Sequence, residues 1–232
     1  MCGRFTLQTP ATDLTAMFDG LRFPSFEPRY NICPTQPAMC IRWDKHLTVE
    51  AIQLRWGLVP SWAKDLKVGA RMINARSETV ASKPSFRSAF KKRRCLVIAD
   101  GFYEWMKIGR TKQPYYITLT DHSPFAMAGL WETWNDPHSE DSSPIETCTI
   151  LTTEANEIMQ PLHDRMPVIL DSDQQKFWLD TGYQDQTQLE KTLVPYDSQL
   201  MQTYPVSPLV NKVGNDTAEC IEPIDLDAGK LF

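Results

Sequence analysis

The chain has 232 residues, of which 42% are hydrophobic, and its formal net charge is −5; this length allows a substantial buried core, and we expect one domain over residues 1–232. Its six cysteines lack the short paired spacings of a zinc site and the density of a secreted disulfide framework. No run approaches the ~18 apolar residues of a membrane span and the first residues lack a signal-peptide pattern, so we expect a soluble intracellular protein with no membrane, metal or cofactor.

Strands dominate the middle of the chain, and a few short helices surround them. In chain order the pattern predicts a helix at Thr9–Phe18 capped by Thr9, strands at Ala38–Trp43 and Leu47–Gln53, a helix at Pro84–Lys92, strands at Cys95–Ala99, Tyr115–Leu119 and Phe125–Trp131, an exposed loop at Asn135–Pro144, a strand at Thr147–Thr152, a helix at Glu154–Gln160, a strand at Val168–Leu170 and a helix at Ser172–Leu179 capped by Ser172. The predicted fold class is α+β, a single domain with a mostly antiparallel, barrel-like β-sheet surrounded by short helices.

Charge is distributed unevenly along the chain. The net charge is +1 over residues 1–61, +9 over residues 62–112 and −15 over residues 113–232. The cations of the middle segment are Lys64, Lys67, Arg71, Arg76, Lys83, Arg87, Lys91, Lys92, Arg93, Arg94, Lys107, Arg110 and Lys112. Such a segment is a candidate phosphate-binding surface on an acidic body, although solvated helix and loop faces explain a charge run equally well.

Cysteine stands at position 2, in the run Met1-Cys2-Gly3-Arg4-Phe5. Its small side chain permits removal of the initiator methionine, which would leave Cys2 as the mature N-terminus. The α-amine and thiol would then be two nucleophiles on adjacent carbons, both partly available near neutral pH. A 1,2-aminothiol condenses with an aldehyde to an imine and then to a thiazolidine ring. An ordinary cytosolic cysteine at position 2 is the alternative.

Four further polar clusters are candidate sites. Asn74 and Arg76 lie two residues apart and share one face if their segment is extended. Glu104 lies among aromatic residues just beyond an apolar strand and is a candidate general acid, and His163, with Asp164 and Arg165 as neighbours, is a candidate proton carrier. The turn Pro205–Asn211 is expected to line a cleft.

Each of these residues also has a plain structural interpretation. Glu104 fits a surface carboxylate beside a hairpin, His163 fits a loop hydrogen bond, and Asn74 fits a turn. Aromatic residues interleave with the basic ones and suit the stacking of unpaired bases, yet tryptophans are more often partly buried in a core. These residues are Trp56, Trp62, Phe86, Phe102, Tyr103 and Trp105.

Taken together, the motifs resemble one family. The quoted runs are Met1-Cys2-Gly3-Arg4-Phe5, Tyr30-Asn31-Ile32-Cys33-Pro34, Trp56-Gly57-Leu58-Val59-Pro60-Ser61-Trp62, Ile73-Asn74-Ala75-Arg76-Ser77-Glu78, Ala99-Asp100-Gly101-Phe102-Tyr103-Glu104-Trp105 and His163-Asp164-Arg165-Met166-Pro167. In this order they resemble the SRAP family of SOS-response-associated, abasic-site-processing proteins. The resemblance spans residues 2 to about 215, and the stretch beyond is less diagnostic.

The resemblance implies a sensor of abasic sites in single-stranded DNA that forms a thiazolidine crosslink through Cys2 and so shields the lesion during repair. In this family Asn74 would hold the N-terminus and the sugar in register. Glu104 would shuttle protons during sugar opening and imine formation, and His163 would assist proton transfer to the sugar oxygen and favour release of the crosslink. The resemblance assigns phosphate contacts to Arg4, Arg76 and Arg165, and a wedge or stacking surface to Trp62. It also implies a weak lyase activity and peptidase removal of Met1, by the protein itself or by an aminopeptidase.

Two other function classes stay open from the residues alone. Cys-Gly after Met1 also begins N-terminal-nucleophile amidohydrolases that cleave glutamine, which would have no use for the basic segment. A non-catalytic single-stranded DNA-binding module would leave Cys2, Glu104 and His163 unexplained. We expect a monomer of unknown protein partners, cytoplasmic and nucleoid-associated in a bacterium or nuclear in a eukaryote.

Overall fold

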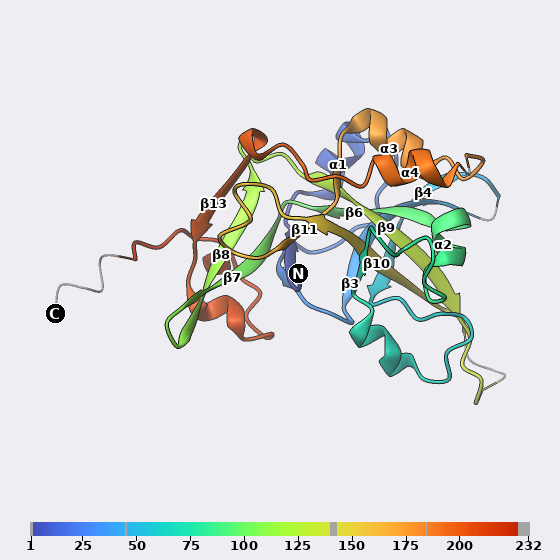
Figure 1. Ribbon diagram of the computed structural model, residues 1–232, viewed down its shortest axis with the longest axis horizontal. Coiled ribbons are helices and arrows are strands. Elements are labelled where there is room, and N and C mark those ends of the chain that lie inside the picture. Colours follow the sequence, from blue (N-terminus) through green and yellow to red (C-terminus); the bar gives the residue numbers. More distant parts are fainter. Residues whose placement is uncertain (1, 45, 140–142, 184, 227–232) are drawn as a thin grey trace.

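Two β-sheets form the body of the protein, and short helices lie on its outside (Figure 1). The structure, a computed structural model, describes residues 2–44, 46–139, 143–183 and 185–226. The arrangement confirms the expected α+β class with a barrel-like, mostly antiparallel sheet. In the described ranges no helix is both long and apolar enough to cross a membrane.

The larger sheet contains a closed ring of five strands. Around the ring these are β3 (Pro37–Trp43), β4 (Val49–Trp56), β10 (Ile145–Glu154), β9 (Phe125–Trp134) and β6 (Arg94–Ala99). The β4–β10 pair is parallel and the other four pairs are antiparallel. Three short strands extend the ring: β5 (Asn74–Arg76) and β11 (Arg165–Pro167) pair with β10, and β12 (Ile169–Leu170) pairs with β9. Closure leaves the ring itself no free edge.

The second sheet has five antiparallel strands. Their order is β13 (Met201–Pro205), β8 (Thr111–Leu119), β7 (Gly101–Ile108), β1 (Phe5–Leu7) and β2 (Arg29–Ile32). Phe5 packs edge-on against Trp56 of the ring with 5.0 Å between ring centroids. Gly101 allows β8 to approach, because a Cβ there would lie 2.2 Å from the ring of Tyr116. The beginning of the chain is therefore held between the two sheets.

The helices are short and cap the body. They are α1 (Ala11–Met17), α2 (Arg87–Lys92), α3 (Ser172–Leu179) and α4 (Gln186–Lys191), with 3₁₀ turns η1 (Leu66–Arg71), η2 (Ser198–Leu200), η3 (Pro208–Asn211) and η4 (Ala218–Cys220). Figure 1 shows α1, α3 and α4 gathered on one side of the molecule, with α2 at the end farthest from the β7–β8 hairpin.

Every predicted strand is present, but one predicted helix is wrong. Residues 154–160 form the end of β10 and a turn, because β11 pairs with β10 as far as Glu154. Asn156 then accepts a hydrogen bond from the amide of Met159 through its side chain. Such side-chain bonds compete with helix formation, and Pro161 follows at once.

Both predicted caps are also wrong. Helix α3 is capped by Asp171, whose side chain accepts from Gln174 in a capping box, so Ser172 lies inside the helix. Thr9 does not cap α1, since its amide and hydroxyl donate to the carboxylate of Asp100 at 3.0 and 2.6 Å.

The basic run Lys91–Arg94 does not form one exposed surface. Arg94 is fully buried, and its guanidinium donates to the main-chain carbonyls of Phe90, Lys91, Trp178, Asp180 and Tyr183. Arg93 pairs with Glu132 at 2.7 Å, while Lys91 and Lys92 are exposed. Arg94 therefore joins α2 to the α3–α4 region and is unavailable to a phosphate.

Candidate functional site

Cys2 lies at the junction of the two sheets and is completely buried. Its Sγ points to the carbonyl oxygen of Arg4 at 3.8 Å, and the chain enters β1 three residues later, where Phe5 pairs with Phe102 of β7. Burial raises the pKa of the Cys2 thiol, and the negative charge of Glu104 raises it further. The thiol is thus held in its protonated form at neutral pH.

Asn74 binds the main chain of Cys2. Its Nδ2 donates to the carbonyl oxygen of Cys2 at 2.7 Å. The parallel pairing of β5 with β10, in which Asn74 lies opposite Ile150, fixes the position of this side chain. Within the described residues its Oδ1 is buried and accepts no hydrogen bond. A buried amide oxygen without a donor is costly, so this atom suits a donor brought by a substrate.

Asn74 and Arg76 do lie two apart on one extended segment, as predicted. Ala75 between them is buried on the other face, and Arg76 is exposed. The two side chains nevertheless differ in environment, because only Asn74 reaches the beginning of the chain.

Glu104 is buried within β7, where it lies opposite Tyr115 of β8. As predicted, it follows an apolar strand, since β6 ends at Ala99; the structure adds that Glu104 belongs to the next strand, and its burial contradicts the alternative of a surface carboxylate. Only 4% of its surface is exposed, yet it lines a cleft. Its charge acts on the Cys2 thiol, which places the two groups in one electrostatic environment.

His163 has two hydrogen-bond partners at one ring nitrogen. Its Nδ1 accepts from the amide of Arg165 at 3.0 Å, which suits the neutral ring. The same atom lies 2.7 Å from Oδ1 of Asp164, which can accept a hydrogen bond whenever Nδ1 carries a proton. The imidazole therefore has a stabilising contact whether it holds one proton or two, as a proton carrier requires.

A cleft of about 570 Å³ brings several of these residues together. It is lined by Arg4, Glu104, Trp105, Lys112, His163 and Asn211. Trp105 donates from Nε1 to Oδ1 of Asn211 at 2.7 Å, which links β7 to the turn that the sequence predicted at a cleft. Sequence reasoning named Trp105 as a candidate for base stacking and Lys112 in the basic segment, but it did not bring them to one cleft with Glu104, because the pairing of β7 with β8 was not foreseen. Cys2 is buried and does not belong to this lining.

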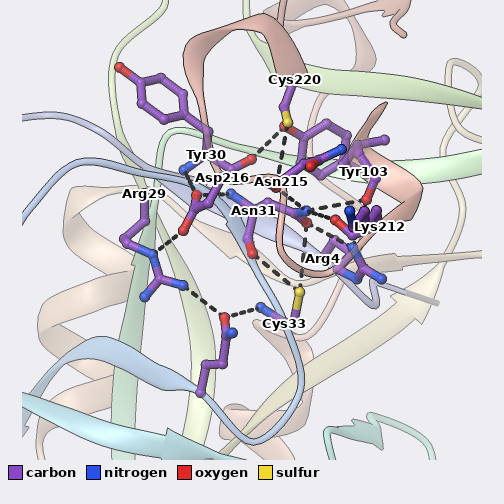
Figure 2. A network of polar contacts seen from close by, with 12 residues as sticks. Arg4, Arg29, Tyr30, Asn31, Cys33, Tyr103, Lys212, Asn215, Asp216 and Cys220 are labelled. Atoms are coloured by element: carbon purple, nitrogen blue, oxygen red, sulfur yellow. Dashed lines mark hydrogen bonds and ion pairs between the residues drawn. The ribbon is translucent and has the colours of Figure 1, made fainter. Parts of the chain in front are cut away.

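Arg4 holds one wall of the cleft in place. Its Nη1 donates to Oδ1 of Asn31 at 2.9 Å and to the carbonyl of Val210 at 2.8 Å. Figure 2 shows this guanidinium inside a network that ties residues 210–216 to β2. Asp216 completes the network by accepting from the amides of Tyr30 and Asn31. The predicted phosphate contact of Arg4 therefore competes with a structural one.

Arg165 is likewise engaged. Its two terminal nitrogens both reach the carboxylate of Glu78, and Nη2 also donates to the carbonyl of Thr152 at 2.6 Å. The same pair lowers the pKa of Glu78, chiefly through the hydrogen bond from Arg165. Arg165 thus ties β11 to β10 and to the turn after β5.

Trp62 is 63% exposed on the loop between β4 and η1. Gly57 and Gly69 close this loop at its base, since a Cβ on Gly57 would lie 2.5 Å from the carbonyl oxygen of Gly69. Gly57 also has a φ of +122°, which disfavours any other residue. Neither Trp62 nor Arg76 belongs to the cleft lining, so both lie outside it. Over the described ranges no group of His, Cys, Asp or Glu is arranged to hold a metal ion.

Comparisons with known proteins agree on one family. The family model described as SOS response associated peptidase (SRAP) matches residues 1–213. The chain is 45% identical over 226 residues to the abasic site processing protein YoqW of Bacillus subtilis (strain 168), covering 96% of this chain and 99% of that protein. It is 35% identical over 240 residues to the abasic site processing protein HMCES of Gallus gallus, covering 90% and 70%. A crystal structure of a protein from Bacteroides thetaiotaomicron matches with a TM-score of 0.85 at 25% identity, covering 96% of this chain and 100% of that one.

Proposed function

Because the chain belongs to the SRAP (SOS response associated peptidase) family, we propose that it processes abasic sites in single-stranded DNA by capturing them covalently through Cys2. The names of its relatives, abasic site processing proteins, support the substrate. The hydrogen bond from Asn74 to the Cys2 carbonyl is the observation that carries the proposal, because it orients the residue with two nucleophiles beside a buried carboxylate.

The reaction uses both nucleophiles of Cys2 once Met1 has been removed. The ring-opened sugar of an abasic site carries an aldehyde, which the α-amine attacks to form an imine with loss of one water. Sγ then adds to the imine carbon, and the thiol proton ends on the nitrogen. The product is a thiazolidine, formed without any change in oxidation state. An internal cysteine has no adjacent amine and stops at a reversible hemithioacetal.

Glu104 and His163 move protons in this scheme. Glu104 donates to the sugar oxygen during ring opening and removes the proton that the amine loses on forming the imine. His163, at the same cleft, protonates the sugar oxygen and assists release by the reverse reaction. Asn74 keeps Cys2 in register, and its Oδ1 accepts from the sugar or from the new amine. Such positioning raises the rate by holding the reactants together.

Contacts to the DNA flanks come from residues around the cleft. Arg76 binds a phosphate from its exposed position on β5, and Trp62 offers an apolar surface to an unstacked base. Arg4 and Arg165 add positive potential near the cleft; the hydrogen bonds of Arg4 hold one of its walls, and those of Arg165 hold β11 against β10.

Two side reactions follow from the same groups. An imine at an abasic site permits β-elimination, so a weak lyase activity accompanies crosslinking wherever ring closure is slower. A retained Met1 would block the amine, so its removal, by the protein itself or by an aminopeptidase, precedes activity. All proposed groups lie on one chain, which fits a monomer acting on chromosomal DNA, in the bacterial nucleoid or the eukaryotic nucleus.

A denaturing gel tests the proposal. Protein with confirmed loss of Met1 is incubated with a single-stranded oligonucleotide carrying one abasic site, beside intact oligonucleotide and a Cys2→Ala variant. We expect a shifted band only with the unsubstituted protein and abasic DNA. No band from that pair would refute covalent capture, and release of ammonia from glutamine would then favour an N-terminal-nucleophile amidohydrolase.

A further inference from the structure

Two lysines face each other across the hairpin that leaves the cleft. In the β7–β8 pairing Lys107 lies directly opposite Lys112, and Arg110 occupies the two-residue turn between the strands. All three side chains are exposed, and in the described parts of the chain none of them has an ion-pair partner.

Like charges directly opposite in an antiparallel pair destabilise the sheet. Fold stability therefore gives no reason for lysine at both positions, whereas a bound polyanion does. The remainder of the protein makes the placement more notable, since residues 113–232 carry a net charge of −15. Three cations within six residues of an acidic protein form a local site of positive potential.

The same face of the hairpin also carries an aromatic ring. Alternate residues of a strand share a face, so Trp105 and Lys107 of β7 lie on one face of the hairpin. Pro114, the cross-strand partner of Trp105, and Lys112, the partner of Lys107, lie on the same face. The indole is partly exposed and is anchored by its hydrogen bond to Asn211. A ring flanked by cations is the combination that binds unpaired bases and their phosphates.

This face is continuous with the cleft. Trp105 and Lys112 line it together with Glu104 and His163. Figure 1 shows the hairpin of β7 and β8 on one side of the dark-blue beginning of the chain, and the teal segment with η1 on the other. The loop of Trp62 directly precedes η1. A strand that passes the beginning of the chain thus has the segment with η1 on one flank and the hairpin on the other.

We propose that Trp105, Lys107, Arg110 and Lys112 form a second arm of the DNA-binding surface, which binds the single-stranded flank that leaves the cleft away from Trp62. This inference rests on the proposed function. Trp105 stacks with a base, Lys112 and Lys107 bind successive phosphates, and Arg110 extends the contact at the hairpin tip.

A salt titration of binding tests the arm. The ligand is a single-stranded oligonucleotide whose central tetrahydrofuran residue mimics an abasic site but has no aldehyde, so binding is measured without crosslinking. The variant is Lys107→Gln/Lys112→Gln. The charge-matched control is Lys91→Gln/Lys92→Gln on α2, at the far end of the molecule.

Each lost phosphate contact lowers the slope of log affinity against log salt by about 0.7 for a single strand, so we expect the double variant to lose about 1.4. Its affinity at low salt falls about tenfold, and the control keeps the original slope. Shortening one flank of the oligonucleotide to two nucleotides removes the difference between variant and unsubstituted protein, whereas shortening the other flank does not. The thermal unfolding midpoint of the double variant is unchanged or higher than that of the unsubstituted protein, because a repulsive pair of charges has been removed.

Three results would contradict the second arm. They are an unchanged salt slope in the double variant, an equal loss of slope in the α2 control, and a loss of slope that does not depend on the length of either flank. Failure of the arm is distinguishable from that of the proposed function. If the unsubstituted protein crosslinks abasic DNA and the slopes are equal, only the arm is wrong. If crosslinking fails but the slope falls, the arm binds single strands and covalent capture is wrong.

Discussion

Nδ2 of Asn74 donates to the carbonyl oxygen of Cys2 over 2.7 Å, and so joins β5 to a residue 72 positions earlier. Cys2 precedes β1 and, within residues 2–44, 46–139, 143–183 and 185–226, has no strand pairing of its own. The side-chain bond therefore helps to fix the orientation of the Cys2 main chain, and among the described residues Oδ1 of the same amide is buried without a hydrogen-bond donor.

Substituting Asn74 should impair chemistry more than folding. In Asn74→Ala the Cys2 main chain loses its anchor, and we expect the single-turnover crosslinking rate to fall between about tenfold and a hundredfold. Asn135→Ala, an exposed amide in the β9–β10 loop, is the matched control. Equal rates for Asn74→Ala and the control would show that the bond has no part in catalysis.

Glu104→Gln should change both the rate and its pH dependence. The maximal crosslinking rate falls about 100-fold or more, because the amide cannot exchange protons. Burial remains, but the charge that helps to raise the pKa of the Cys2 thiol is gone, so that pKa falls. The rise of rate with pH then moves to lower pH. The measurement is a profile of crosslinking rate against pH, with Glu157→Gln, which changes an exposed carboxylate, as the control. An unshifted profile in Glu104→Gln would show that the charge of Glu104 does not act on the Cys2 thiol.

His163→Ala should slow the release of the crosslink. Without the imidazole, proton transfer to and from the sugar oxygen depends on water, and we expect a loss of about 100-fold in the reversal rate. Asp164→Asn removes the carboxylate beside Nδ1 but keeps the ring, and should give an intermediate loss. Transfer of crosslinked protein to excess competing abasic DNA measures the rate. Reversal as fast in His163→Ala as in the unsubstituted protein would exclude this role.

Asp216→Ala should loosen the wall that presents Asn211. The carboxylate accepts from the amides of Tyr30 and Asn31 and pairs with Arg29, so its loss leaves main-chain donors unsatisfied. We expect a loss of about 2 kcal/mol in unfolding free energy and weaker binding of abasic oligonucleotides. Chemical denaturation measures the first and a binding titration the second. Glu219→Ala, an exposed carboxylate of the same segment, should change neither, and an Asp216→Ala protein of full affinity would show that this wall does not contact DNA.

The ring strands and the polar motifs were predictable because their signals are local. Short apolar runs reveal β3, β6 and β10 to within two residues at each end, and β9 to within three. The two-residue spacing of Asn74 and Arg76 likewise fixes their common face. The helix predicted at residues 154–160 failed because the pairing of β10 with β11 overrides local propensity.

The functions of the charged residues were less predictable, because they depend on distant parts of the chain. Arg94 looks like one more surface cation, but it binds carbonyls near residue 180. Arg4 and Arg165 look like free phosphate ligands, yet Asn31 and Glu78 engage them. A wall held by Asp216 through contacts nearly 190 residues apart leaves no signal in any short window of sequence.

One comparison tests most directly whether both nucleophiles of Cys2 capture the abasic site. The unsubstituted protein and Cys2→Ser, each freed of Met1, are incubated with abasic single-stranded DNA, with and without borohydride. Serine keeps the α-amine but lacks the thiol, and borohydride makes an imine permanent. We predict that the unsubstituted protein gives a denaturation-resistant band without borohydride and that Cys2→Ser gives one only with it. A Cys2→Ser band that needs no borohydride, or an unsubstituted protein that needs it, would contradict thiazolidine formation.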